Sequence, residues 1–283
     1  MNGSGRLVMI GLGPGTPGYL TLKAVEEARK ADHRVVDAYT SVLLGEGLEK
    51  VIGPFERVQR PYLEIPDEWL RAHRGKTVAV LVPGDPMIST THVTLMLDAK
   101  KLDFEVEVIH GISIFDLIGG IGLQSTRFGR IVSLVYPYAG YVATSPLELI
   151  AFNLWQDLHT LVLLDLDPSG EGVAEPKPMT PAIAHDVLLQ AQGVLRGEVK
   201  KKEGDDYHSV KSNVVQRFTE VDITEMKVVL CSDLGGSGQR IEVGVVGDLM
   251  YAQPGTIHAL VVPSNLHDIE LQAWSSHPPI RSQ

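Results

Sequence analysis

The first half of the chain alternates short apolar runs with segments of helical periodicity. Residues 6–12 are almost continuously apolar, which predicts a strand buried on both faces of a parallel sheet. After a glycine-rich turn, Thr21 is placed to cap a helix in which apolar residues recur every three or four positions. Further strands are expected over 34–37, 78–82 and 106–109, and a helix over 89–101. This alternation predicts an α/β domain with a largely parallel sheet.

The second half contains shorter apolar runs and one long helical segment. Strands are expected over 131–136, 160–165, 227–231, 242–246 and 259–262, and a helix over 181–192. A connecting helix over 113–121, loosened near its end by two glycines, separates the halves. We therefore predict two α/β domains, residues 1–114 and residues 115–283, the second with a more mixed sheet. The polar stretch 197–214 has few residues able to form a core and is interpreted as a solvated loop.

Composition and charge narrow the class of protein. The 283 residues are 44% apolar, which is enough to bury a core in each of two domains. A formal net charge of −10 disfavours binding to nucleic-acid phosphates, so no nucleic-acid partner is expected. No apolar run approaches the roughly 20 residues of a membrane-spanning helix, and the first residues are too polar for a signal peptide. We therefore expect a cytoplasmic protein without a membrane partner.

Three turns rich in small residues each follow a predicted strand: residues 11–15, 83–86 and 110–114. The first lacks the last glycine of the dinucleotide-binding fingerprint, because Thr16 stands there, and this argues against a nicotinamide oxidoreductase. Taken singly, each turn is explained as an ordinary tight turn. Parallel strands end at one edge of their sheet, however, so the three turns together predict a ligand site.

Several familiar catalytic patterns are absent from the sequence. It has no nucleophile elbow, no phosphate-binding P-loop, no paired histidines with zinc spacing and only one cysteine, Cys231. Hydrolases, kinases and metalloenzymes are therefore disfavoured, and no metal site is expected.

Four well-separated segments carry a more specific signal. Residues 81–92, which read LVPGDPMISTTH, resemble the diphthine synthase family of tetrapyrrole methylases, as do residues 108–114, 158–165 and 259–267. The resemblance covers almost the whole chain. It implies a two-domain tetrapyrrole-methylase-like fold, a cofactor in the cleft between the domains, and a homodimer.

The resemblance also implies a set of residues that bind S-adenosylmethionine. They are Pro14, Asp85, Ile88, Ser113, Ile114, Leu164, Leu234 and His258. The segment around Leu234 departs from the family pattern, so its register can shift to Asp233. The sequence identifies no catalytic residue, although His92 is a candidate for substrate contact or proton acceptance. Its alternative role is structural, at the start of a helix.

The function implied is N-methylation of the aminocarboxypropyl-modified histidine of translation elongation factor 2, in diphthamide synthesis. Two alternatives stay open. Residues 11–18 look more like the corresponding loop of corrinoid and siroheme methylases, which keeps a tetrapyrrole C-methyltransferase possible. The loops are also compatible with a nucleotide-binding module that has no catalytic activity.

Overall fold

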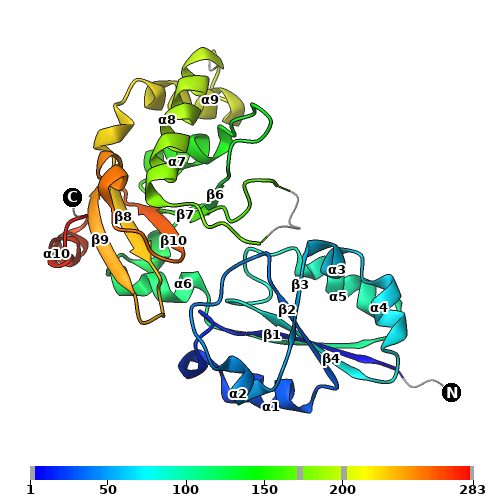
Figure 1. The fold of residues 1–283 in the computed structure, drawn as a ribbon. Helices are drawn as coiled ribbons and strands as arrows, with labels where there is room; N and C mark the ends of the chain where they lie inside the picture. Colours follow the sequence, from blue (N-terminus) through cyan, green and yellow to red (C-terminus); the bar gives the residue numbers. More distant parts are fainter. Residues whose placement is uncertain (1–3, 171–174, 199–202, 281–283) are drawn as a thin grey trace. The chain divides into compact units, whose positions relative to one another are not determined.

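The computed structural model describes residues 4–170, 175–198 and 203–280 (Figure 1). It divides into two compact units, each with its own five-stranded sheet. Unit 1 contains the described residues up to Leu117 together with 175–177 and 234–237. Unit 2 contains the remainder. The domain boundary expected after Ile114 remains a prediction.

The sheet of unit 1 is entirely parallel, in the order β3-β2-β4-β1-β5. Its strands are β1 (Arg6–Gly11), β2 (His33–Asp37), β3 (Glu56–Val58), β4 (Thr77–Val82) and β5 (Glu105–Ile109). Successive side chains of β1 point to opposite faces, and residues 7–10 are fully buried. A strand covered on both faces has no need of polar positions, which explains the continuous apolar run.

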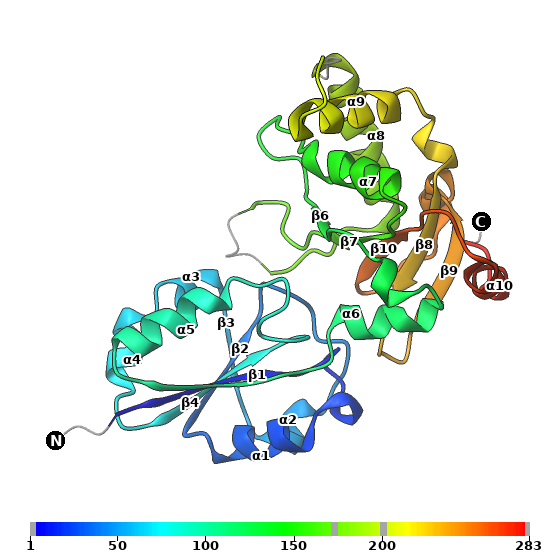
Figure 2. The same ribbon diagram turned by 180° about the vertical axis from the view of Figure 1, so that it is seen from behind.

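Helices cover both faces of this sheet (Figures 1 and 2). The helices of unit 1 are η1 (Pro17–Tyr19), α1 (Leu22–Lys30), α2 (Leu48–Ile52), α3 (Arg60–Glu64), α4 (Asp67–Ala72), α5 (His92–Lys101) and α6 (Ile114–Leu117), and α1 and α5 lie on opposite faces of the sheet. On one face Val8 and Ile10 share a buried cluster with Ala24 of α1. On the other, Leu7 and Met9 pack with the cluster that includes Leu95 of α5. Because both faces are covered, ligands reach this sheet at its ends.

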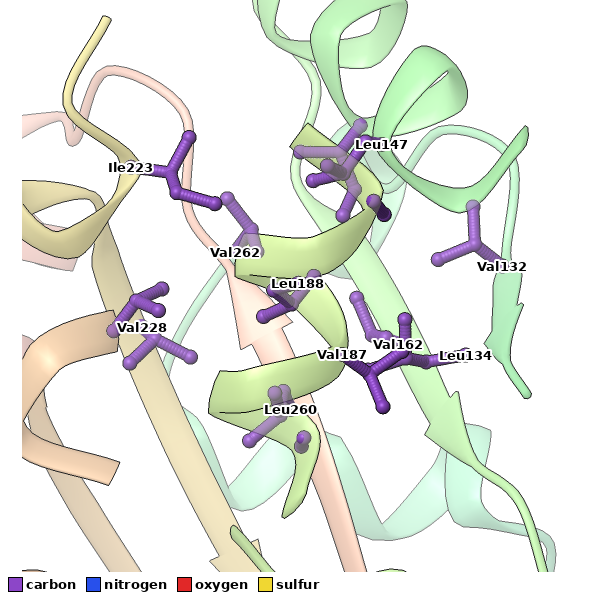
Figure 3. Close-up of a cluster of buried hydrophobic side chains, with 14 of the residues drawn as sticks. Val132, Leu134, Leu147, Val162, Val187, Leu188, Ile223, Val228, Leu260 and Val262 are labelled. Atoms are coloured by element: carbon purple, nitrogen blue, oxygen red, sulfur yellow. The ribbon is translucent and has the colours of Figure 1, made fainter. Parts of the chain in front are cut away.

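The sheet of unit 2 is mixed, in the order β6-β7-β10-β8-β9, with only β6 and β7 parallel. Its strands are β6 (Val132–Leu134), β7 (Thr160–Leu164), β8 (Lys227–Ser232), β9 (Arg240–Val245) and β10 (His258–Val262). The helices are η2 (Ile118–Ile121), η3 (Ser125–Arg127), α7 (Ser145–Trp155), α8 (Pro181–Glu198), α9 (Tyr207–Thr219), η4 (Ile223–Glu225), η5 (Val246–Tyr251) and α10 (Asp268–Ser276). Figure 3 shows part of the buried core of this unit, which contains Val187 and Leu188 of α8 together with Val162 of β7 and Leu260 of β10.

Two predictions for this part of the chain need correction. Residues 207–214 belong to α9 and not to a solvated loop, because the carboxylate of Asp206 accepts the N–H groups of His208 and Ser209 and starts a helix there. Val215 of α9 is buried in the core, while 199–202 lie outside the described residues. The expected helix 113–121 is split into α6 and η2, and the two glycines fall in the second piece.

Across the ranges that the structure describes, no helix is both long enough and apolar enough to cross a bilayer.

Candidate functional site

Four glycines bring the loops after β1, β4 and β5 into backbone contact. The N–H of Gly13 donates to the carbonyl of Gly84 at 3.1 Å, and the N–H of Gly84 donates back at 2.7 Å. A Cβ at Gly111 would lie 2.3 Å from the Gly84 oxygen, and one at Gly11 would lie 2.4 Å from the Gly111 nitrogen. Only glycine permits approaches this close. The three loops therefore meet at one edge of the sheet, as the sequence predicts.

The carboxylate of Asp85 joins the second loop to the third. The residue is 4% exposed. Its Oδ2 accepts the N–H of Gly111 at 3.1 Å and lies 2.8 Å from Nδ1 of His110, while its Oδ1 accepts the N–H of Met87 at 2.8 Å. A carboxylate has about four lone-pair sites. Asp85 can therefore hold this junction and still accept a hydrogen bond from a cationic ligand.

The other predicted cofactor-binding residues of these loops differ in how exposed they are and in which of their groups are already hydrogen-bonded. Ile88 is 38% exposed, so its side chain is available for contact. Ser113 is buried, and the carboxylate of Asp116 accepts both its hydroxyl, at 2.9 Å, and its N–H, at 2.7 Å. That hydroxyl is thus committed to the start of α6, where Ile114 follows, half-buried. The carbonyl of Pro14 accepts the N–H of Leu44 at 3.0 Å.

His92 lies at the start of α5 and is only 2% exposed. Its Nδ1 is 3.2 Å from the carbonyl oxygen of Pro86, and its Nε2 is 3.1 Å from Oδ2 of Asp37. Both ring nitrogens thus face groups of the fold itself, which favours the structural alternative for His92 over direct contact with a substrate.

In unit 2, the predicted residues Leu164 and His258 lie side by side at the end of two paired strands, since Leu163 pairs with Ala259. Nε2 of His258 accepts the N–H of Gly255 at 3.1 Å, so the ring proton is on Nδ1, which lies 2.8 Å from the hydroxyl of Ser232. Burial is the largest effect on this histidine and lowers its pKa to about 4. The ring is therefore a neutral, fully engaged group at physiological pH.

The loop after β8 contains the position whose register the sequence leaves open. Leu234 is 6% exposed, and Asp233 before it has a φ of 50°, in the left-handed region. Oδ1 of Asp233 accepts the N–H groups of Thr256 and Ile257 at 2.8 and 2.9 Å, which fixes the turn that leads into β10. The carboxylate of Asp233 thus has a structural task of its own.

A second buried carboxylate lies in unit 2, at Glu270 of α10, which is 0% exposed. It accepts the N–H groups of Gln124 and His267, each at 3.0 Å, and pairs with the guanidinium of Arg127 and with Nε2 of His159. Burial works to raise the pKa of Glu270, but these hydrogen bonds outweigh it and lower the pKa to about 2. Glu270 therefore remains charged and ties together three segments, at residues 124–127, 159 and 267–270.

Sequence reasoning missed the pairs Asp37–His92 and Arg127–Glu270, because no local pattern connects residues so far apart in the chain. It did identify Asp85 and the small-residue turns. One further signal was available: Gly11, Gly84 and Gly111 all stand at or within two residues of a strand's carboxyl end. The structure gathers the predicted residues Pro14, Asp85, Ile88, Ser113 and Ile114 on the three joined loops, and Leu164 with His258 in unit 2. Their role in binding a cofactor stays a prediction.

The chain thus contains one parallel and one mixed sheet. The joined loops of the parallel sheet contain the buried carboxylate of Asp85. The sequence matches the family model of tetrapyrrole (corrin/porphyrin) methylases over residues 6–250. The chain therefore belongs to the tetrapyrrole methylase family, and the fold class expected from the sequence is confirmed.

Relatives that match the chain over most of its length include diphthine synthases. The chain is 34% identical to that of Methanosarcina acetivorans, covering 94% of both chains, and 31% identical to that of Methanococcus maripaludis, covering 94% of this chain and 96% of the relative. A crystal structure of diphthine synthase has 25% sequence identity to it and a TM-score of 0.77, with 96% of each chain covered. These similarities confirm the resemblance seen in the sequence motifs.

Proposed function

We propose that this chain is an S-adenosylmethionine-dependent methyltransferase that methylates the amine of the aminocarboxypropyl-modified histidine of translation elongation factor 2. This is the diphthine-forming step of diphthamide synthesis. The observation that carries the proposal is the 34% identity to a diphthine synthase over 94% of both chains. A match of this length includes both units, so each has a counterpart in the relative.

The carboxyl edge of the sheet in unit 1 suits this cofactor chemically. S-adenosylmethionine carries positive charge on its sulfonium and its ammonium, which favours a neighbouring carboxylate and carbonyl oxygens. Asp85 supplies the carboxylate, and the exposed part of Ile88 supplies apolar contact. A Cβ at Gly84 would meet nothing within 4 Å, so the backbone is open to a ligand there. Further proposed contacts are Pro14, Ser113, Ile114, Leu164, Leu234 and His258.

When bound, the cofactor supplies a methyl group on a sulfonium. The chain's own contribution is to hold the acceptor amine unprotonated, in line and away from water, which can supply most of the rate acceleration. The loops suit this task because glycine contacts and the bonds of Asp85 fix them before any ligand arrives. Both ring nitrogens of His258 are engaged within the fold, so we assign no general base to it.

We further propose that the protein acts as a homodimer in the cytoplasm, where its protein substrate is found, and that it has no nucleic-acid partner. The net charge of −10 supports the last point. Light scattering of the purified protein in solution tests the dimer, because a mass of one chain would contradict it.

The function is tested with radiolabelled S-adenosylmethionine and elongation factor 2 that carries the aminocarboxypropyl-histidine intermediate. A factor in which this histidine is replaced serves as the control. Label on the first factor alone is expected. Cofactor binding without label on the factor would contradict the proposal, and label on a tetrapyrrole precursor would then identify a tetrapyrrole C-methyltransferase.

A further inference from the structure

The buried histidine at the start of α5 connects the carboxyl ends of two neighbouring strands in the sheet of unit 1. Asp37 is the last residue of β2, whereas Pro86 stands in the loop after β4. The ring of His92 lies between them, 3.1 Å from the carboxylate and 3.2 Å from the carbonyl oxygen. Nδ1 donates to the carbonyl of Pro86, whereas Nε2 lies within ion-pair distance of the Asp37 carboxylate without forming a hydrogen bond to it.

Asp37 is a fixed anchor for this ring. It is 1% exposed. Its Oδ1 accepts the N–H groups of Tyr39 and Thr40 at 2.9 and 3.0 Å, and its Oδ2 accepts the hydroxyl of Thr40 at 2.5 Å. Backbone and hydroxyl donors from Tyr39 and Thr40 therefore hold the carboxylate in one place. A buried carboxylate held this way is a firm point of attachment for the side chain that contacts it.

The carbonyl of Pro86 is where this anchor reaches the candidate site. The same oxygen accepts the hydroxyl of Thr90 at 2.6 Å. Pro86 follows Asp85 directly, and Ile88 stands two residues further on. On its other side the loop is fastened by the bonds of Asp85 to Gly111 and His110. The loop is thus held from both sides, by Asp85 toward β5 and by His92 toward β2.

We propose that His92, anchored by Asp37, is a positioning residue for S-adenosylmethionine binding. It acts through the Pro86 carbonyl to keep Asp85 and Ile88 in place, and it does not touch the ligand. The proposal rests on the proposed function, since it concerns the same cofactor. It differs from the roles considered for His92 from the sequence, because it requires neither substrate contact nor proton transfer.

Two substitutions separate the two contacts of the ring. The amide nitrogen of asparagine is two bonds from Cβ, as Nδ1 is, so His92→Asn retains a donor for Pro86. The amide nitrogen of glutamine is three bonds from Cβ, as Nε2 is, so His92→Gln retains the contact with Asp37 and loses the bond to Pro86. We expect His92→Gln to weaken S-adenosylmethionine binding about tenfold, and His92→Asn to weaken it by less than about threefold. Isothermal titration calorimetry measures both.

His73 provides the matched control, because its Nδ1 is also within hydrogen-bond distance, 2.7 Å, of a carbonyl oxygen, that of Trp69. It precedes β4, at the opposite end of the sheet from the loops. His73→Gln is expected to lower the melting temperature and to leave cofactor affinity unchanged. Thr90→Val removes the other donor to Pro86 without disturbing a buried ring, and we expect it to weaken binding about threefold.

The outcomes are distinct. If wild-type protein does not bind S-adenosylmethionine, the proposed function fails, whatever the variants do. If wild type binds and His92→Gln binds equally well, His92 has no positioning role. A fall in kcat with a shifted pH profile and unchanged affinity would instead show a chemical role. If neither His92 variant folds, Thr90→Val decides, because unchanged affinity there overturns the proposal.

Discussion

Each unit of this methyltransferase contains a buried carboxylate that holds loops together, and the two differ in their partners. Asp85 in unit 1 accepts two backbone N–H groups and contacts His110, whose side chain is 73% exposed. Glu270 in unit 2 accepts two backbone N–H groups as well, but it also pairs with Arg127 and with His159, which is fully buried. The histidine beside the first carboxylate is largely exposed, whereas the second carboxylate is paired inside the fold with a guanidinium and with a fully buried histidine.

This difference suggests a division of tasks between the two carboxylates. A buried charge that is matched within the fold contributes mainly to stability, and breaking the pair leaves the partner charge uncompensated. A buried carboxylate that has no guanidinium or ammonium partner within the fold can also bind a ligand. Variants of Glu270 should therefore affect unfolding, and variants around Asp85 should affect cofactor binding.

The largest effect is expected for Glu270→Gln. The substitution keeps the shape of the side chain but removes the negative charge beside Arg127 and His159. We expect the free energy of unfolding to fall by about 3 kcal/mol in urea titrations. S-adenosylmethionine affinity should not change. Glu26→Gln, at an exposed pair with Lys30, is the control and should leave the free energy of unfolding nearly unchanged.

The same carboxylate predicts a dependence on acid. The pKa of Glu270 is lowered to about 2, whereas an unfolded glutamate titrates near about 4.3. Its contribution is therefore complete above the unfolded value and is lost as the pH falls toward 2. Wild type should lose stability over this interval more steeply than Glu270→Gln, and equal slopes would show that other groups dominate.

Gly111→Ala is expected to have the next largest effect. The new Cβ would overlap the backbone of Gly84 and Gly11, and neither can move without opening the joined loops. We expect a loss of about 2 kcal/mol in unfolding free energy and at least a roughly thirtyfold loss of cofactor affinity. Gly18→Ala is the control, because a Cβ at Gly18 meets nothing within 4 Å. If Gly111→Ala bound the cofactor as tightly as wild type, the three loops would not be part of the cofactor site.

Asp85→Asn tests the carboxylate of unit 1 with a smaller structural change than Gly111→Ala. The amide keeps one acceptor for Gly111 or Met87 but offers a donor where the other acceptor stood. We expect about a tenfold rise in the Kd for S-adenosylmethionine, by calorimetry. Asp32→Asn is the matched variant, because Asp32 accepts the N–H of Thr77 at the opposite end of β4. A similar loss of affinity in Asp32→Asn would mean that Asp85 acts only through overall stability.

The smallest effect concerns His258, in unit 2. Its pKa is lowered to about 4, chiefly by burial, and the unfolded residue titrates near about 6.5. The fold holds the ring neutral, so the contribution of His258 to the free energy of unfolding is fully present above pH 6.5 and is lost as the pH falls toward 4. We expect about 1 kcal/mol less stability at pH 5.5 than at pH 7, and a flatter profile in His258→Gln. Nitrogen chemical shifts that report a protonated ring at pH 5.5 would contradict this.

Much of the fold can be predicted from the sequence where the pattern of apolar residues alone determines the element. Strands β1 and β4 of unit 1 are nearly continuous apolar runs, and the predicted limits of β1, β2, β4 and β5 each differ from the observed limits by a single residue. The edge strand β3 was not predicted, because only Val58 of its three residues is buried. Helix α9 was missed because its charged and polar residues resemble a loop, and its start depends on the side chain of Asp206.

The candidate site could be predicted only in part, for a related reason. Parallel strands must end together, so the meeting of the loops that contain Gly11, Gly84 and Gly111 follows from strand order. The contact of His92 with Asp37 does not, because it depends on how β2 and α5 pack. The same holds for Arg127 and Glu270, which are 143 positions apart.

The glycine contacts also have a genetic consequence. Every single-nucleotide missense change in a glycine codon introduces a side chain, and at Gly11 and Gly111 that side chain would overlap backbone atoms. At Gly84 it would meet a φ of 76°, which L-residues rarely adopt. Three codons far apart in the reading frame therefore lead to one defect. Variants at these positions, whether inherited or selected in the laboratory, should form a single phenotypic class.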